Sequence, residues 1–265
     1  MSMQRRTFVA ALSAAAAAPV LASSLGHAQA AGIPNPPVSG ELLSRHMRSY
    51  LDAELADPTT AQRVVPWLFD IGFDWSPPTK PLDEIDFVIG YAFGNRPPVG
   101  GGDPSKVRYE PGPVNEQLAD TIAEIRSRRT VPVYAQWEIA HFLVSKYQMS
   151  QVVSIEPVVQ PDGTITYLST DGVAAQVVEM RKSNPGGIGT AGVVGFRDHV
   201  KRCVLTTEAR GMAAFAPRDF EMPGTYDPES GQPWTRRRDL YLVHDMFAQW
   251  GMLRTNLIAE LYPQG

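Results

Sequence analysis

Cysteine is almost absent from this sequence. Cys203 is the single cysteine among 265 residues, so no disulfide can form within the chain. Iron–sulfur clusters and cysteine-based zinc sites are excluded for the same reason, because each needs several thiolates. Two roles stay open for Cys203 itself: a thiolate nucleophile, or a small apolar side chain buried on a helix, which is the more common use of an unpaired cysteine.

Excess positive charge and long hydrophobic runs are missing too. The formal charge is −4, whereas a nucleic-acid partner requires a basic face. Beyond residue 30 no segment approaches the roughly 18 consecutive apolar residues of a membrane-spanning helix, so we expect no stable membrane insertion after cleavage of the N-terminus. The four histidines beyond residue 30 are widely scattered, and we expect no metal site.

Residues 1–30 have the three parts of a twin-arginine signal peptide. Arg5-Arg6 stand before an uncharged, Ala-rich run, and Ala28-Gln29-Ala30 supplies a small-x-small cleavage pattern. The pattern predicts recognition by the twin-arginine export machinery, cleavage near Ala30 and a periplasmic or otherwise exported protein. A retained leader that acts as an anchor and a buried N-terminal helix are the alternatives. Cleavage would leave 235 residues and, with two arginines lost, a formal charge of −6.

The segment 31–82 is predicted to be a linker followed by N-terminal helices. Residues 31–39 are rich in proline, and helical spacing of apolar residues predicts a helix over 41–56. A second short helix is predicted to start near Asp57-Pro58. The proline-rich stretch 75–81 is a rigid connector to the domain that follows.

Strands and helices alternate along residues 83–265. The first strand, 86–93, is apolar almost throughout, as in strands buried on both faces of a sheet. The order indicates an α/β, Rossmann-like, doubly wound domain with a mostly parallel sheet and helices on both faces. Further strands are predicted over 131–135, 151–156, 164–168, 191–196 and 212–216, and helices over 113–128, 138–147, 171–182 and 198–210.

A long C-terminal helix is predicted over residues 236–261. Its apolar side chains recur at helical spacing, and such a stripe usually packs against a core. We therefore expect this stripe to cover the sheet. It consists of Leu240, Val243, Met246, Phe247, Trp250, Leu253 and Leu257.

Ligands of open parallel sheets bind beyond the carboxyl ends of the strands. The loop over residues 90–102 is rich in glycine, which lets a backbone approach a phosphate or carboxylate closely. We therefore select Gly90, Gly94 and Asn95 as ligand-binding candidates. The pattern is neither G-x-G-x-x-G nor a P-loop, and a flexible loop without a ligand is the alternative interpretation.

Two further candidates head predicted helices. Glu138 opens the helix after the second strand, where a glutamate either improves the electrostatics of a helix N-terminus or takes part in catalysis. Thr170 stands in Ser169-Thr170-Asp171, which is typical of an N-cap and also lies where a ligand would bind. We select Glu138 as a catalytic candidate and Thr170 as a ligand-binding candidate.

The strongest candidates are His199 and Arg202. They follow a buried strand, open a helix, and share one helix face because they are three residues apart. With the helix dipole they would form a positive pocket for an anion. His199 is the predicted general acid or base, since its ordinary pKa lies near neutrality, and Arg202 would bind the anion. Lys201 should point elsewhere, and a solvated basic turn is the alternative.

The same residues carry a resemblance to a known family. Residues 199–203 match a strand-following His-x-x-Arg-small block, and the next helix ends in Gly211 before a short strand that ends in Pro217. With the Gly-containing first strand and the Thr-headed helix, the chain resembles the SanA/ElyC/YdcF-type family of bacterial proteins over roughly 86–255. It has Ala135-Gln136-Trp137 where that family usually has Ser-Gly-Gly, and it lacks the family's Thr-x-Glu-Asn at Thr170.

The resemblance implies a Rossmann-like fold and a role in envelope or peptidoglycan processes, and one branch of the family is associated with S-adenosylmethionine. We therefore expect an exported, envelope-associated protein that binds an anionic small molecule, either nucleotide-like or a cell-wall precursor, with cofactor and reaction left open. The alternative is a non-enzymatic envelope interaction protein with a decayed pocket. A binding role requires His199, Arg202, Thr170 and the loop 90–102 to converge on one concave site.

Overall fold

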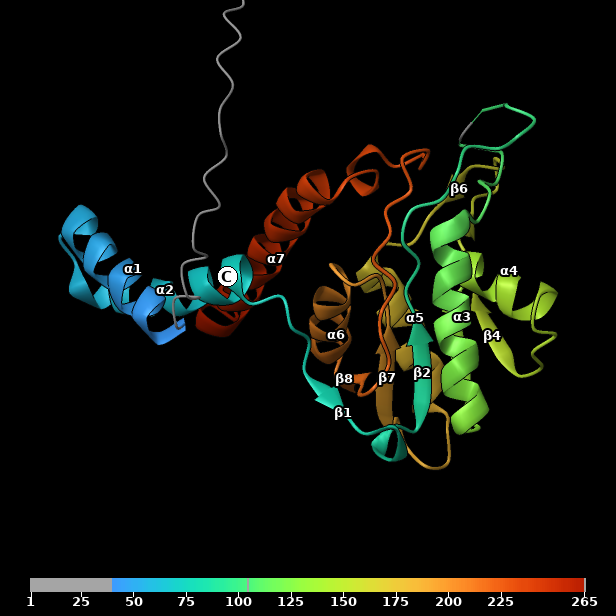
Figure 1. The fold of residues 1–265 in the computed structure, drawn as a ribbon, viewed down its shortest axis with the longest axis horizontal. Coiled ribbons are helices and arrows are strands. Elements are labelled where there is room, and N and C mark those ends of the chain that lie inside the picture. Colours follow the sequence, from blue (N-terminus) through green and yellow to red (C-terminus); the bar gives the residue numbers. More distant parts are fainter. Residues whose placement is uncertain (1–39, 104, 265) are drawn as a thin grey trace, which may run out of the picture.

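The computed structural model describes residues 40–103 and 105–264, and these form an α/β protein. A six-stranded, all-parallel sheet has the order β1-β8-β7-β2-β3-β4 (Figure 1). Helices cover both faces, so the predicted Rossmann-like, doubly wound fold is confirmed. The predicted signal peptide lies outside the described residues. The strands are β1 (Thr79–Lys80), β2 (Phe87–Gly90), β3 (Val133–Gln136), β4 (Val152–Ile155), β7 (Thr190–Val194) and β8 (Ala213–Pro217), with β5 (Val158–Val159) and β6 (Ile165–Thr166) in a separate antiparallel pair.

The strand order reverses at β2, in the middle of the sheet. From β2 the chain proceeds to β3 and β4 on one side, and it then returns to β7 and β8 on the other. Every residue of β2 is buried, which explains its apolar sequence. The ladder ends at Gly90, before the predicted end of the strand at Phe93, because the amide of Ala92 donates instead to the side chain of Gln136 at 2.8 Å. This departure opens a crevice beside β2.

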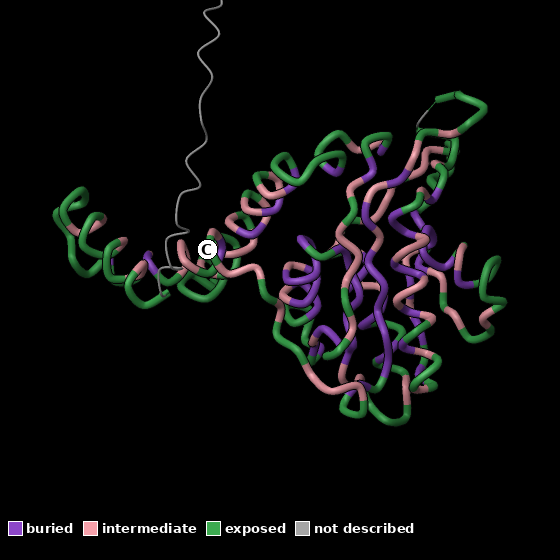
Figure 2. The backbone as a smooth tube through the Cα atoms, in the orientation of Figure 1, coloured by how far each residue is buried: buried purple, intermediate pink, exposed green. Residues whose placement is uncertain are grey.

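The two faces of the sheet have separate cores. Helices α3 (Pro113–Arg128) and α4 (Trp137–Ser145) pack on one face, and α5 (Thr170–Lys182) and α6 (Val200–Ala209) pack on the other. Figure 2 shows the buried strands between these two layers. The four predicted helices agree with these bounds to within two residues at each end.

The N-terminal helices extend away from the sheet (Figure 1). Helices α1 (Gly40–Leu55) and α2 (Pro58–Phe73) form a hairpin in which no residue of α1 is buried. Asp57 caps α2 by accepting a hydrogen bond from the amide of Thr60 at 3.0 Å. Lys201 of α6 holds the other end of α2, since its buried Nζ donates to the carbonyls of Asp70 and Asp74 at 2.8 and 2.6 Å.

The long C-terminal helix α7 (Arg238–Leu261) is present, but its expected core-facing stripe is wrong. Val243 and Phe247 are 66% and 79% exposed, whereas Tyr241, Asp245 and Gln249 are buried. The helix runs from the crevice toward α2 instead of covering the sheet (Figure 1). Its buried face is polar because it meets Arg202 of α6. The apolar residues Val243 and Phe247 lie on the opposite side. In the described part of the chain no helix has the length and hydrophobicity needed to cross a membrane.

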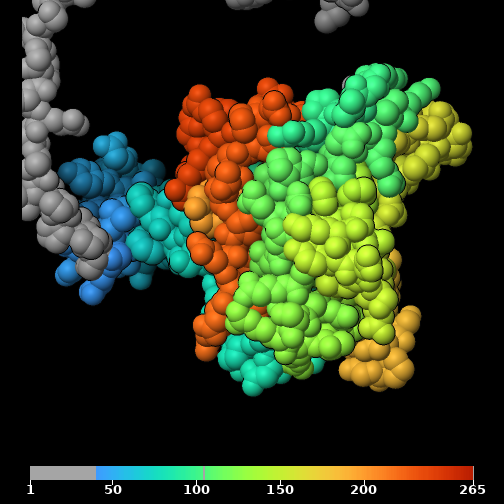
Figure 3. Space-filling model, turned by 45° about the vertical axis from the view of Figure 1, so that its right-hand side comes forward, coloured from blue at the N-terminus to red at the C-terminus, as the bar shows by residue number. Residues whose placement is uncertain are grey.

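The connection from β8 to α7, residues 218–237, crosses the sheet face beside α3 (orange-red in Figure 3). Phe220, Met222 and Tyr226 pack against the core that includes α3 and α4. The connection ends in a short 3-10 helix, η2 (Pro233–Thr235), next to the crevice. This connection and α7 together form one wall of the crevice.

Candidate functional site

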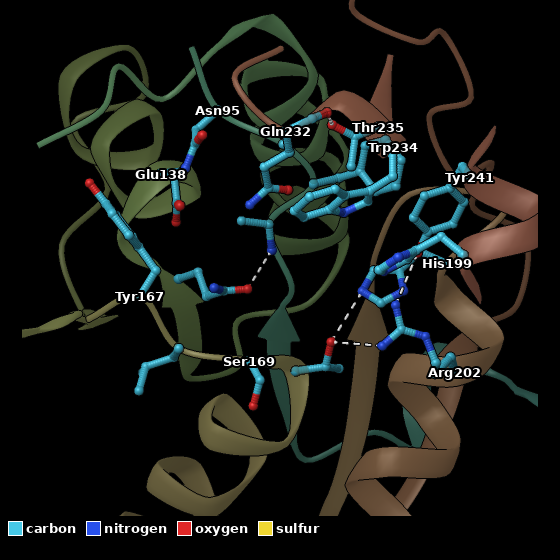
Figure 4. A pocket seen from close by; sticks show the side chains of 17 residues that line it. Asn95, Glu138, Tyr167, Ser169, His199, Arg202, Gln232, Trp234, Thr235 and Tyr241 are labelled. Carbon is cyan, nitrogen blue, oxygen red and sulfur yellow. Dashed lines mark hydrogen bonds between the residues drawn. The ribbon is translucent and has the colours of Figure 1, made fainter. Parts of the chain in front are cut away.

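A cavity of about 290 Å³ lies at the carboxyl ends of β2 and β3 and at the start of α6, which follows β7 (Figure 4). Five segments line it: the loop after β2, the start of α4, the start of α5, the start of α6, and the stretch from η2 into α7. We call it the switch-point cavity, because the strand order reverses there. Its position is the one in which open parallel sheets bind their ligands.

Most of the predicted site residues come together in this cavity. Gly94, Asn95, Glu138, Thr170, His199 and Arg202 all line it. Gly90 does not, because it is the last residue of β2 and a Cβ there would lie 2.8 Å from Ile122 of α3. Gly90 is therefore a packing residue, and its glycine lets the helices approach the strand. The glycines at 100–102 also lie outside the cavity wall.

Position 94 requires glycine because another segment of the same chain packs closely against it, not because of a ligand. Its φ is +66°, and a Cβ there would lie 2.8 Å from Ser230 Oγ and 2.9 Å from Thr235 Oγ1. Asn115 of α3 fixes the same loop, accepting from the amide of Phe93 at 2.9 Å and donating to the carbonyl of Gly94 at 2.7 Å. The loop over 93–95 is thus a rigid wall, in contrast to the flexible loop considered above.

Arg202 forms a dense network at one end of the cavity. Its Nε donates to Asp245 Oδ1 at 2.5 Å, Nη1 donates to Thr170 Oγ1 at 3.2 Å, and Nη2 donates to the Tyr241 hydroxyl at 3.2 Å. Asp245 also accepts from the Tyr241 hydroxyl at 3.0 Å and from Gln249 Nε2 at 2.8 Å. Burial alone would raise the pKa of Asp245, but the hydrogen bond from His199 and the charge of Arg202 lower it far below its ordinary value. The ion pair therefore stays charged.

His199 lies beside this network as a buried, uncharged imidazole. Its side chain is 6% exposed, with Nδ1 3.6 Å from Asp245 Oδ1 and Nε2 3.5 Å from Thr170 Oγ1. Burial and then the charge of Arg202 lower the pKa of His199 to about 4, against the opposing effect of Asp245. The nearby carboxylate favours the tautomer with its proton on Nδ1, which leaves Nε2 as an acceptor on the Thr170 side.

Two helices begin at this end of the cavity. Ser169 caps α5 by accepting from the amide of Gly172 at 3.1 Å, and Thr170 is the first residue of that helix. His199 is the N-cap residue of α6. Helix N-termini carry partial positive charge, so both favour an anion in the cavity. The N-cap expected within Ser169-Thr170-Asp171 is present at Ser169, and the cap places Thr170 in the wall.

Glu138 and Asn95 form the opposite wall of the cavity (Figure 4). Both are buried, 4% and 6% exposed, and Glu138 Oε2 and Asn95 Oδ1 have no hydrogen-bond partner among the described residues. Burial raises the pKa of Glu138 to about 7, against the lowering effects of its own backbone amide, the Asn95 side chain and Arg108. This end of the cavity is therefore short of hydrogen-bond donors.

Several lining residues were missed by sequence analysis. Tyr241, Trp234 and Gln136 contribute to the wall, and Asp245 lies behind it. A signal for one group was present: Tyr241, Asp245 and Gln249 recur at i, i+4 and i+8, which places a polar stripe along an otherwise apolar helix. Gln136 and Trp234 carry no comparable pattern, because their positions depend on how distant segments pack.

Metal and thiol chemistry gain no support from the geometry. Within residues 40–103 and 105–264, no group of three or more His, Cys, Asp or Glu side chains is placed to hold a metal ion. Cys203 is fully buried on α6, and burial raises the pKa of its thiol well above the ordinary value. A reactive thiolate needs the opposite environment, which agrees with the apolar role for Cys203.

No family model, curated protein or solved structure matches this chain.

Proposed function

We propose that the switch-point cavity binds a small anionic molecule through a phosphate or carboxylate group. The observation that supports this best is the convergence of Arg202 and the first turns of α5 and α6 on one cavity. A guanidinium and helix N-termini both favour negative charge. Thr170 accepts a hydrogen bond from Arg202, and its one hydroxyl proton can be donated either to His199 Nε2, 3.5 Å away, or to a ligand.

The ion pair with Asp245 does not cancel this preference. Asp245 is 1% exposed and lies behind Arg202, on the side away from the cavity. The pKa of His244, which also lines the cavity, is lowered first by burial and then by the charge of Arg202, which outweighs the opposing charge of Asp245. Arg202 thus lies on the cavity side of the pair, and Asp245 holds the guanidinium in place from behind.

His199 is the group best placed to move a proton in the bound ligand. Its Nε2 faces Thr170 beside the cavity, and it is uncharged at neutral pH because its pKa is about 4. A bound anion would raise that pKa toward neutrality, since an opposite charge favours the protonated imidazole. Glu138, on the opposite wall with a pKa of about 7, is the second candidate acid or base. We propose these roles for any reaction that occurs in the cavity.

We also propose that the protein is exported and serves the cell envelope. Support for export comes from Arg5-Arg6 and Ala28-Gln29-Ala30, and support for the envelope role comes from the resemblance to the SanA/ElyC/YdcF-type family. On this proposal the twin-arginine machinery is a partner, and the anionic ligand is nucleotide-like or a cell-wall precursor. Replacing both Arg5 and Arg6 by lysine should stop export, and N-terminal sequencing of the exported chain should begin near Ala31. An intact Met1 on exported protein would contradict the cleavage.

A non-enzymatic interaction protein is the second candidate. The observation that favours it is the exposed apolar side of α7, where Val243 and Phe247 face outward, because exposed apolar patches often mark interaction surfaces. On that proposal the cavity has lost its ligand. Binding of an anion in the cavity distinguishes the two.

The test of anion binding is a thermal-shift screen of the purified full chain with inorganic phosphate and with phosphorylated or carboxylated small molecules. A ligand at 100 times its dissociation constant should stabilise the protein by about 2.7 kcal/mol. Thr170→Val should weaken binding, since it removes the donating hydroxyl while keeping the shape of the side chain. Arg210→Ala is the control for charge, because Arg210 is an exposed arginine at the end of α6, the helix of Arg202, and pairs with Asp171 outside the cavity wall. Equal losses in both variants would indicate diffuse charge and contradict a site.

A further inference from the structure

The end of the switch-point cavity formed by Glu138 and Asn95 lacks hydrogen-bond donors, and a ligand could supply them. Glu138 Oε2 and Asn95 Oδ1 are buried acceptors without a partner among the described residues. Native proteins satisfy nearly all buried polar groups, and each unsatisfied one costs free energy. Trp137 Nε1, His199 Nδ1 and Gln249 Oε1 are buried without a partner as well, but only Glu138 and Asn95 place two acceptors on neighbouring side chains in the wall of one cavity, among the described residues. Both need a group that donates hydrogen bonds.

The orientation of the Asn95 amide follows from its neighbour. The Asn95 side chain lies beside Glu138 and lowers the pKa of its carboxyl, and an NH₂ group that faces the carboxylate is the orientation with attraction. A flipped amide would bring its oxygen against the carboxylate oxygens, with repulsion instead of attraction. Oδ1 is then the remaining acceptor of Asn95, on the side chain next to Glu138.

The size and the remaining walls of the cavity limit the ligand further. A volume of about 290 Å³ lies at the small end of the range of about 300–1,000 Å³ for ligand pockets, which favours a single sugar-sized unit over a dinucleotide. Tyr167 and Trp234 line the same space, and the Trp234 ring is stacked on His244 with 5.2 Å between centroids. Aromatic faces of this kind suit the apolar faces of a sugar ring.

We propose that the ligand is a sugar phosphate, with its phosphate at Arg202 and Thr170 and its hydroxyl groups donating to Glu138 and Asn95. This inference rests on the proposed anion site and assigns its substrate class. Figure 4 shows the two ends of this arrangement, with Asn95 and Glu138 on one side of the cavity and His199 and Arg202 on the other. Hydroxyls suit this end better than an ammonium group, because one of the two acceptors is a neutral amide and the burial of Glu138 disfavours its charge.

Calorimetric titration of the full chain with four probes tests this assignment: ribose 5-phosphate, glucose 1-phosphate, inorganic phosphate and phosphoethanolamine. At least one sugar phosphate should bind ten-fold or more tightly than inorganic phosphate, because hydrogen bonds to a carboxylate are strong. Glu138→Gln should remove most of that advantage, whereas Arg210→Ala, outside the cavity wall, should leave it intact. Asn95→Ala should have a smaller effect in the same direction.

Proton release provides a readout that a merely structural role of Glu138 would not change. Hydroxyl donors favour the ionised carboxylate, so binding of the sugar phosphate near pH 7 should release protons from Glu138. Titrations in two buffers of different ionisation enthalpy should show that Glu138→Gln releases fewer protons than the wild-type chain, because proton exchange by the phosphate and by His199 is common to both.

The outcomes separate this inference from the anion site itself. If inorganic phosphate binds and neither sugar phosphate binds more tightly, the anion site stands and the sugar-phosphate assignment is wrong. Tighter binding of phosphoethanolamine than of both sugar phosphates would overturn the assignment in favour of an ammonium-bearing ligand. If none of the four probes binds, the sugar-phosphate assignment is wrong, and the anion site fails as well if no carboxylated molecule stabilises the protein in the thermal-shift screen.

Discussion

The two ends of the switch-point cavity differ in how many hydrogen-bond partners a buried carboxyl group has. At one end Asp245 accepts hydrogen bonds from Arg202, Tyr241 and Gln249. At the other end Glu138 is just as deeply buried and has one oxygen without a partner among the described residues. Substitutions that break the hydrogen bonds of Asp245 at the first end should therefore lower the stability of the protein most. An unpartnered buried acceptor costs free energy, and a ligand that donates hydrogen bonds to the second end would recover it.

The largest effect should follow from breaking the paired end. Asp245→Ala removes the carboxylate that neutralises Arg202 and leaves a buried charge unpaired, which typically costs about 3–5 kcal/mol. Chemical denaturation of the variant should show a correspondingly lower midpoint. The double variant Asp245→Leu with Arg202→Met should recover most of the loss, because it removes both charges. A loss no smaller in the double variant would show that the pair does not act as a unit.

The pH dependence of stability should separate the two ends next. The folded pKa of Glu138 is raised from 4.5 to about 7, so its contribution is present at low pH and is lost as the pH rises toward 7. The folded pKa of His199 is lowered from 6.5 to about 4, so its contribution is present above pH 6.5 and is lost as the pH falls toward 4. Each pKa shift corresponds to a change on the order of 3 kcal/mol in the free energy of unfolding. Between pH 4.5 and 6.5 the two groups change this free energy with pH in opposite directions.

Single variants should expose these opposing slopes. Relative to wild type, Glu138→Gln should gain stability at neutral pH and lose this advantage as the pH falls to 4.5. His199→Gln should change in the reverse direction over the same range, becoming relatively more stable as the pH falls. The measurement is urea denaturation at several pH values. Parallel pH profiles for both variants and wild type would contradict the assignment of buried, shifted groups at the two ends.

The smallest effect is expected for an ion pair of the same chemistry that is exposed. Arg210 pairs with Asp171 on the surface, next to the cavity but outside its wall. Solvent screens such pairs and their side chains lose entropy on pairing, so Arg210→Ala should leave the denaturation midpoint within experimental error. A loss comparable to that of Asp245→Ala would mean that burial is not what distinguishes the two pairs.

The fold could be predicted from sequence where local pattern and burial agree. The α3 range 113–128 matches its prediction because its apolar residues face one core. Strand β2 reads as apolar because both of its faces are covered. The stripe of α7 was wrong for the converse reason: its buried residues are polar and are held by α6, while Phe247 is exposed. Hydrophobic periodicity cannot identify a helix face that is buried by ion pairing.

The candidate site was predictable where a residue follows a strand directly. His199, Arg202, Thr170 and Glu138 stand at helix starts, and parallel strands bring such starts to one edge. Asp245 comes from a helix more than 40 residues beyond Arg202, and only tertiary packing brings them together. Gly90 was predicted to bind a ligand because glycine allows the close approach of either a ligand or a packed side chain. Sequence alone does not distinguish these two roles.

The most direct test of the central claim is a crystal structure of the protein with ribose 5-phosphate or whichever sugar phosphate binds more tightly. We expect phosphate oxygens within about 3 Å of the Arg202 guanidinium and the Thr170 hydroxyl, and sugar hydroxyls on Glu138 and Asn95. A sugar phosphate bound in the reverse orientation, or bound outside the switch-point cavity while the cavity stays empty, would contradict it.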